Sequence, residues 1–155
     1  MKYLIQDDRK EIAEYSDEPI RRPPEKWQKA IHNKFYGKIK RSASHVRSGN
    51  GEKKAIWMAP TKESGYYEVQ AYVSDAGLPI PFWRPKNDEE EKLYHFKVFH
   101  DNGEEVVPVN VRNYKSDWVS LGEYYFTGDS ARIELSNRSK VKAVIADAVK
   151  LIHDN

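Results

Sequence analysis

The chain has 155 residues, the size of a single domain, and its 26 basic and 24 acidic residues leave a net charge of +2. The two signs are mixed along the chain, which excludes the basic stripe expected of a nucleic-acid-binding protein. Cysteine is absent, so disulfides, a cysteine nucleophile and cysteine-ligated metal sites are excluded. We therefore expect one polar-surfaced domain over residues 1–155.

The first part of the chain carries weak strand signals. Residues 3–6 fit a short strand, and residues 10–18 fit a strand or a short helix equally well. Trp27 is expected to anchor the core. The loop 47–54 contains Gly-Asn-Gly, but no Gly-Lys-Ser or Gly-Lys-Thr follows, so we reject a phosphate-binding loop.

Two strands follow at 55–59 and 65–73, and the second has the clearest alternation in the chain. One face of 65–73 is formed by Tyr67, Val69, Ala71 and Val73. The opposite, outward face is formed by Tyr66, Glu68, Gln70 and Tyr72. Tyr66 and Tyr72 are therefore candidates for contact with a ligand.

Residues 74–91 form a long irregular segment with three prolines around Phe82 and Trp83. Binding residues concentrate on loops held by a rigid scaffold, so Trp83 beside Phe82 is our best candidate for a ligand platform. The alternative is that both rings cap the open edge of the core. The acidic run 88–91 fits a solvated face better than a calcium site, because it lacks the spacing of converging oxygen ligands.

A hairpin is predicted next. Residues 93–100 alternate, Asp101-Asn102-Gly103 is a strong turn, and 106–111 returns as the partner strand. Pro108 indicates an edge strand or a bulge, because proline cannot donate to the strand ladder.

Three apolar segments at 118–126, 131–135 and 143–152 close the chain. Alternation in the first places Trp118, Tyr124 and Phe126 on one face and Val119, Leu121 and Tyr125 on the other. Gly122 in its middle indicates a bulge or a close backbone approach. In the last segment, Ile145, Asp147, Val149 and Leu151 are expected on one face.

Asp147 is unusual because it falls among apolar residues. A buried carboxylate must be hydrogen-bonded or paired. We favour a structural Asp147 that accepts backbone N–H bonds or pairs with an arginine over a catalytic or metal-binding one.

The closing pattern resembles the golvesin and xanthan-lyase C-terminal-like domain. The resemblance rests on Trp118, Leu121-Gly122, Phe126, Ile133 to Asn137, and Val144 to Val149. Further matches, in the expected order, are Trp27, Phe35-Tyr36-Gly37, Ala55-Ile56-Trp57, Gly65 to Val69, Asp101-Asn102-Gly103 and Val109-Asn110. They span about 3–152. Val111 departs from the pattern, since many members carry glutamine there.

The resemblance implies an all-β, antiparallel jelly-roll β-sandwich similar to galactose-binding domains. It also implies an accessory piece of a larger secreted, periplasmic or surface bacterial protein. The N-terminus does not fit a signal peptide, because its apolar stretch is only Tyr3-Leu4-Ile5. We therefore expect an excised domain or one whose export signal was removed, without a membrane span.

The leading hypothesis is a non-catalytic carbohydrate-binding module that holds a glycan through Trp83, Phe82, Tyr66 and Tyr72, with no cofactor and no metal. The alternative is a structural module that packs against neighbouring domains without glycan affinity. Enzyme activity is disfavoured: no Gly-x-Ser-x-Gly motif is present, and the five histidines form no metal-ligand spacing. The opposed carboxylates of a glycosidase cannot be recognised among 24 acidic residues.

Overall fold

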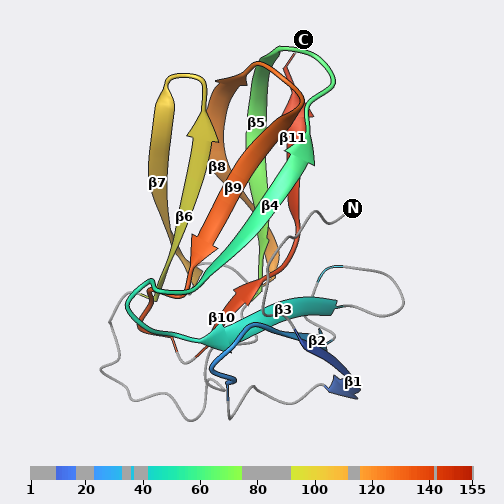
Figure 1. Cartoon of the computed structure of the whole chain (residues 1–155), viewed down its shortest axis with the longest axis vertical. Coiled ribbons are helices and arrows are strands. Elements are labelled where there is room, and N and C mark those ends of the chain that lie inside the picture. The colour runs from blue at the N-terminus through green and yellow to red at the C-terminus, as the bar shows by residue number, and fades with distance from the viewer. Residues whose placement is uncertain are drawn as a thin grey trace.

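The computed structural model describes residues 10–16, 23–32, 36, 42–74, 92–111, 116–141 and 143–154, and these form an all-β protein (Figure 1). No α-helix occurs in this part of the chain. The strands are β1 (Lys10–Ser16), β2 (Gln28–His32), β3 (Ser42–Arg47), β4 (Lys54–Pro60), β5 (Gly65–Val73), β6 (Leu93–His100), β7 (Gly103–Asn110), β8 (Asp117–Phe126), β9 (Ser130–Ser136), β10 (Ala143–Ala146) and β11 (Val149–His153).

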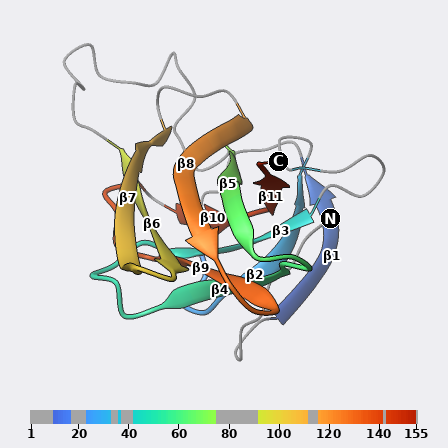
Figure 2. The same ribbon diagram turned by 90° about the horizontal axis from the view of Figure 1, so that it is seen from above.

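The strands form three sheets, with orders β4-β9-β6-β7, β11-β5-β8 and β1-β2-β3-β10. All pairings are antiparallel except β1 with β2, which is parallel. Figures 1 and 2 show the first two sheets facing each other as two layers, with β3 and β10 crossing at one end. The predicted all-β sandwich is confirmed, while its jelly-roll connectivity stays a prediction.

The core lies between the two facing sheets. Every second residue of β5 from Tyr67 to Val73 is buried, and these side chains meet inward residues of the opposite sheet such as Phe96 and Ile133. Trp27 is 1% exposed, which confirms it as a core anchor. Side chains of this size each contribute about 1.5–3 kcal/mol when fully buried.

Several local predictions are confirmed. β5 and β6 have the predicted bounds, and residues 10–16 form a strand, one of the two alternatives left open for 10–18. The β6–β7 turn uses Gly103 at a φ of +127°. Pro108 lies on β7, the edge strand of its sheet. The predicted strand at 3–6, with Phe82 and Trp83, lies outside the described residues.

The predicted alternation along β8 is wrong beyond Gly122. The register shifts there, and Gly122 has a φ of +115°, so the predicted bulge is present. A bulge adds one residue to one strand and reverses which face the following side chains occupy. Trp118 and Tyr125 consequently pair with the outward residues of β5, while Phe126 is buried.

The segment 143–152 is not one strand as predicted. β10 pairs with β3 and β11 pairs with β5, so the chain passes from one sheet to another at Asp147 and Ala148. All residues from Ala143 to Val149 are buried, because this crossing is covered on both sides. An alternating pattern cannot describe a segment without an exposed face.

Candidate functional site

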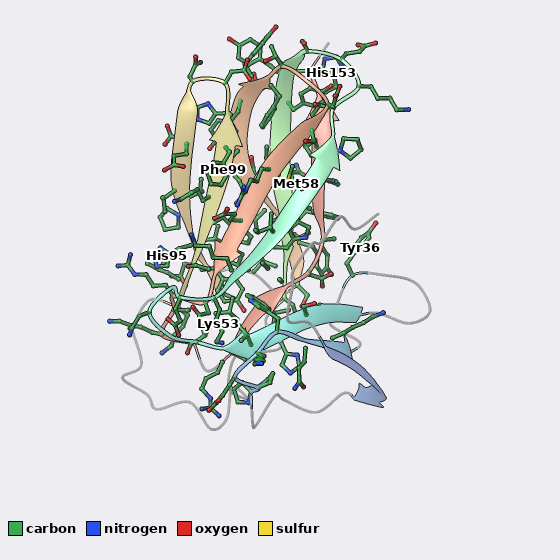
Figure 3. The ribbon with its side chains drawn as sticks, viewed as in Figure 1. Tyr36, Lys53, Met58, His95, Phe99 and His153 are labelled. Carbon is green, nitrogen blue, oxygen red and sulfur yellow. The ribbon has the colours of Figure 1, made fainter. Side chains whose placement is uncertain are left out.

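Three aromatic rings meet on the outer side of the β11-β5-β8 sheet. Tyr72 on β5 and Trp118 on β8 are direct cross-strand partners, with ring centroids 5.4 Å apart. Tyr36 lies 5.2 Å from Tyr72 and 5.1 Å from Trp118. We call these three residues the aromatic platform. The Tyr36 side chain is 36% exposed, and Figure 3 shows it at the margin of the sheets.

Hydrogen bonds hold two of the platform residues. The Tyr72 hydroxyl donates to the Ser116 carbonyl oxygen at 2.9 Å. The Tyr36 backbone N–H donates to Asp147 Oδ2, also at 2.9 Å. The platform is therefore fixed to the sheet from two directions before any ligand arrives.

Asp147 connects the platform to the core. Its side chain is 2% exposed, and its backbone carbonyl accepts the indole N–H of Trp57 at 2.9 Å. Its carboxylate accepts a backbone N–H, as the structural interpretation of this residue expected. Asp147 thus positions Tyr36 at the corner where β10 ends and β11 begins.

A cation extends the platform. The Lys150 ammonium lies 4.3 Å from the centroid of the Trp118 ring, within the range of a cation–π contact. Lys150 is exposed on β11, opposite Gln70 of β5. It supplies a hydrogen-bond donor beside an aromatic surface.

A second aromatic pair occupies the other end of the same sheet face. Tyr66 is 53% exposed and packs edge-on against Tyr125, with centroids 5.1 Å apart. Between the two ends lie cross-strand pairs of polar side chains: Glu68 with Glu123, and Gln70 with Ser120. At about 3.3 Å per residue, Tyr66 and Tyr72 are roughly 20 Å apart along β5. The face is thus a polar strip with aromatic rings at both ends.

The structure places Tyr66 and Tyr72 at opposite ends of the same outward face, Tyr66 exposed and Tyr72 half-buried, while Phe82 and Trp83 lie outside the described residues. Sequence reasoning did not find the remaining members of the face. The bulge at Gly122 hid the outward pairing of Trp118 and Tyr125. Tyr36 could not be found from periodicity, because its hydrogen-bond partner Asp147 lies 111 residues away in the sequence.

The described residues contain no group of three or more histidine, aspartate or glutamate side chains arranged to hold a metal ion. In that same part of the chain, no helix is long and apolar enough to cross a membrane. The outward face of the β11-β5-β8 sheet is the candidate site because it gathers aromatic rings, a cation and polar side chains.

This architecture, with an outward aromatic face, defines a small all-β domain. The model of the Golvesin C-terminal domain matches residues 12–153, and the chain belongs to this family. No curated protein matches the sequence.

Two solved structures from Paenibacillus are similar to this chain. A xanthan lyase is 22% identical with a TM-score of 0.64, over 83% of this chain and 11% of the lyase. A cycloisomaltooligosaccharide glucanotransferase complexed with cycloisomaltoheptaose is 17% identical with a TM-score of 0.46, over 86% of this chain and 18% of that protein. The chain thus spans a small fraction of both proteins, and the xanthan lyase match supports the fold.

Proposed function

We propose that this chain is a non-catalytic carbohydrate-binding module that holds a glycan across the outer face of the β11-β5-β8 sheet. The observation that carries the proposal is the aromatic platform on the outward side of this sheet, where Tyr36 is exposed and Tyr72 and Trp118 are half-buried, with a second aromatic pair at the other end of the face.

The chemistry of the face suits a sugar chain. Pyranose rings present apolar C–H faces and equatorial hydroxyls, so they combine an aromatic surface with nearby hydrogen-bonding groups. Here the hydrogen-bonding groups are the carboxylates of Glu68 and Glu123, the Gln70 amide and the Lys150 ammonium. An extended face about 20 Å long can bind several sugar rings in a row.

The setting proposed for the module is a larger extracellular or cell-surface protein. Membership of the Golvesin C-terminal domain family and the resemblance to a small part of a xanthan lyase support it. In this setting the module keeps its parent protein near a polysaccharide, while any chemistry belongs to other domains.

The experiment is a glycan-array screen of the chain, followed by calorimetric titration of the best ligand with three variants. Trp118→Ala removes the platform ring that contacts both Tyr36 and Lys150. Phe99→Ala is the matched control, because Phe99 lies on the outward side of the opposite sheet (Figure 3). Trp83→Ala tests the loop aromatic predicted from the sequence.

We expect Trp118→Ala to weaken binding by more than 1 kcal/mol, the loss typical of an aromatic hot spot, while Phe99→Ala leaves it unchanged. Melting temperatures of all variants establish that they are folded. A well-folded wild type that binds no glycan would refute the proposal and favour the structural module. Loss of binding only in Trp83→Ala would move the site to the loop.

A further inference from the structure

The outer side of the other sheet, β4-β9-β6-β7, carries a polar hollow near the start of β6. Its volume is about 450 Å³, and it opens between the 49–50 loop and the 138–140 turn. A second hollow of about 200 Å³ adjoins it on the sheet. His95 and Arg138 line both, and we call the two hollows together the groove.

The charges lining this groove are mostly positive. Among the lining residues that the structure describes, the basic side chains are Lys54, Lys97, Arg138 and Lys140, and the one carboxylate is that of Glu134. Glu134 is 4% exposed, and it is already bound by Arg132 through two hydrogen bonds and by Lys54 at 3.7 Å. Glu134 is thus neutralised, and Lys97 is paired with Glu104 at 3.7 Å, so the positive charge of the described part of the groove is carried mainly by Arg138.

Two of the lining groups have unused hydrogen-bonding capacity. Within the described residues, the Arg138 guanidinium makes no hydrogen bond or ion pair, and the ring nitrogens of His95 have no partner. The Asn137 amide next to Arg138 is by contrast fully engaged, and it holds the turn to the 49–53 loop through the Gly51 and Lys53 N–H groups at 3.1 Å. The arginine is therefore presented from a turn that is fixed in place.

We propose that this groove binds the carboxylate groups of an acidic polysaccharide, with Arg138 and His95 as the two contacting residues. A guanidinium binds a carboxylate with two parallel hydrogen bonds, and an imidazole adds a third donor. Figure 3 shows His95 and Tyr36 on opposite sides of the molecule, so this site is separate from the aromatic platform. The groove can therefore be tested separately from the glycan binding that we propose for the aromatic platform.

The electrostatics of His95 give the site a pH dependence. Burial, and after it the positive charge of Arg138, lower the pKa of His95 below its usual 6.5. A bound carboxylate between the two groups offsets both effects and raises the pKa of His95, so binding takes up a proton. Affinity should then increase as the pH falls through the pKa of His95. Among the described residues, the charged groups around His95 are Arg138, Lys140, Lys54, Lys97 and Glu134, with Glu104 paired to Lys97.

The test is affinity electrophoresis and calorimetric titration with polygalacturonate, a polyuronate, and with dextran as the neutral polymer. The variants are Arg138→Gln, His95→Gln and Trp118→Ala, and Lys62→Gln is the matched control. Lys62 is an exposed cation in the β4–β5 turn, at the far end of the sheet from the groove.

We expect the wild type to bind polygalacturonate and not dextran at this site. Arg138→Gln should lose at least about tenfold in affinity, the loss of a charge-assisted bidentate contact. Lys62→Gln should stay within about twofold, and Trp118→Ala should bind polygalacturonate normally. His95→Gln should lose the increase in affinity at low pH.

Three results would overturn the proposal. The wild type could fail to bind polygalacturonate, or Lys62→Gln could lose as much affinity as Arg138→Gln, which would mean unspecific attraction by net charge. Inorganic phosphate could also displace the polymer completely at matched ionic strength, which would assign the groove to a small free anion. Melting temperatures show whether each variant is folded. We expect that of Arg138→Gln to equal that of the wild type, because Arg138 is exposed and its substitution leaves the core unchanged.

Discussion

Gly122 holds the bulge that turns Trp118 and Tyr125 to the same outward face, and replacing it by alanine should therefore damage both stability and binding. Its φ of +115° is a backbone conformation that other residues rarely adopt. Alanine there costs about 1–3 kcal/mol in backbone strain. The new Cβ would also lie 2.7 Å from the Tyr124 hydroxyl oxygen.

Tyr124 cannot move away at no cost. Its hydroxyl donates to the Leu121 carbonyl oxygen at 2.6 Å, and its ring stacks on His100 with centroids 4.8 Å apart. Losing that hydrogen bond adds about 1 kcal/mol. The total is about 2–4 kcal/mol, which corresponds to a fall in melting temperature of roughly 5–15 °C for a domain of this size.

The assay is thermal unfolding followed by circular dichroism, with Gly103→Ala as the matched control. Gly103 has a similar φ of +127°, but a Cβ there would meet no atom within 4 Å. Gly103→Ala should therefore show the backbone cost alone, and Gly122→Ala should melt several degrees lower. Equal melting temperatures for the two variants would refute the argument that Tyr124 contributes to the cost.

Three further predictions concern single side chains. Asp147→Ala removes the acceptor of the Tyr36 N–H, so the free energy of unfolding, measured in urea, should fall by about 1–3 kcal/mol. Glycan affinity should fall as well. Affinity equal to wild type in a folded variant would contradict the positioning role. Glu134→Ala removes the carboxylate of a residue that is 4% exposed and bound by two cations, and it should lower the free energy of unfolding in urea by about 2 kcal/mol. An unchanged free energy of unfolding would mean that the paired charges make no net contribution to stability. Hydrogen bonds from the Thr127 hydroxyl and amide lower the pKa of Asp101 below its usual 3.8. Thr127→Ala should therefore be less stable than wild type at neutral pH, and this difference should vanish as the pH falls through and below 3.8, where Asp101 is protonated. A difference that persists at about pH 2 would assign the effect to other contacts.

The fold class could be predicted from the sequence because most strands bury one face and expose the other. β5 is the clearest case, since alternation from Gly65 to Val73 gives both its bounds and its two faces. The β6–β7 hairpin was equally predictable, because its Asn-Gly pair supplies the turn and Pro108 indicates the edge.

The candidate site was harder to predict from the sequence, because it depends on contacts between distant segments. A periodic pattern gives the facing of each side chain only while the strand stays regular, and the bulge at Gly122 interrupts it. The change of sheet at Asp147 removes the exposed face altogether. Tyr36 joins the platform through Asp147, and no local rule relates two positions so far apart.

The change of sheet at Asp147 also bears on how the protein folds. β5 lies between β8 and β11, and its partner β11 comes from the last residues of the sandwich, about eighty positions later in the sequence. Pairing across such a separation carries a large loop-closure entropy and comes late in folding. A chain that ended before Val149 would retain nearly all of the core side chains but leave the backbone of β5 unpaired along one edge. Such an open edge pairs readily with other chains, so β11 protects the nearly finished domain from aggregation.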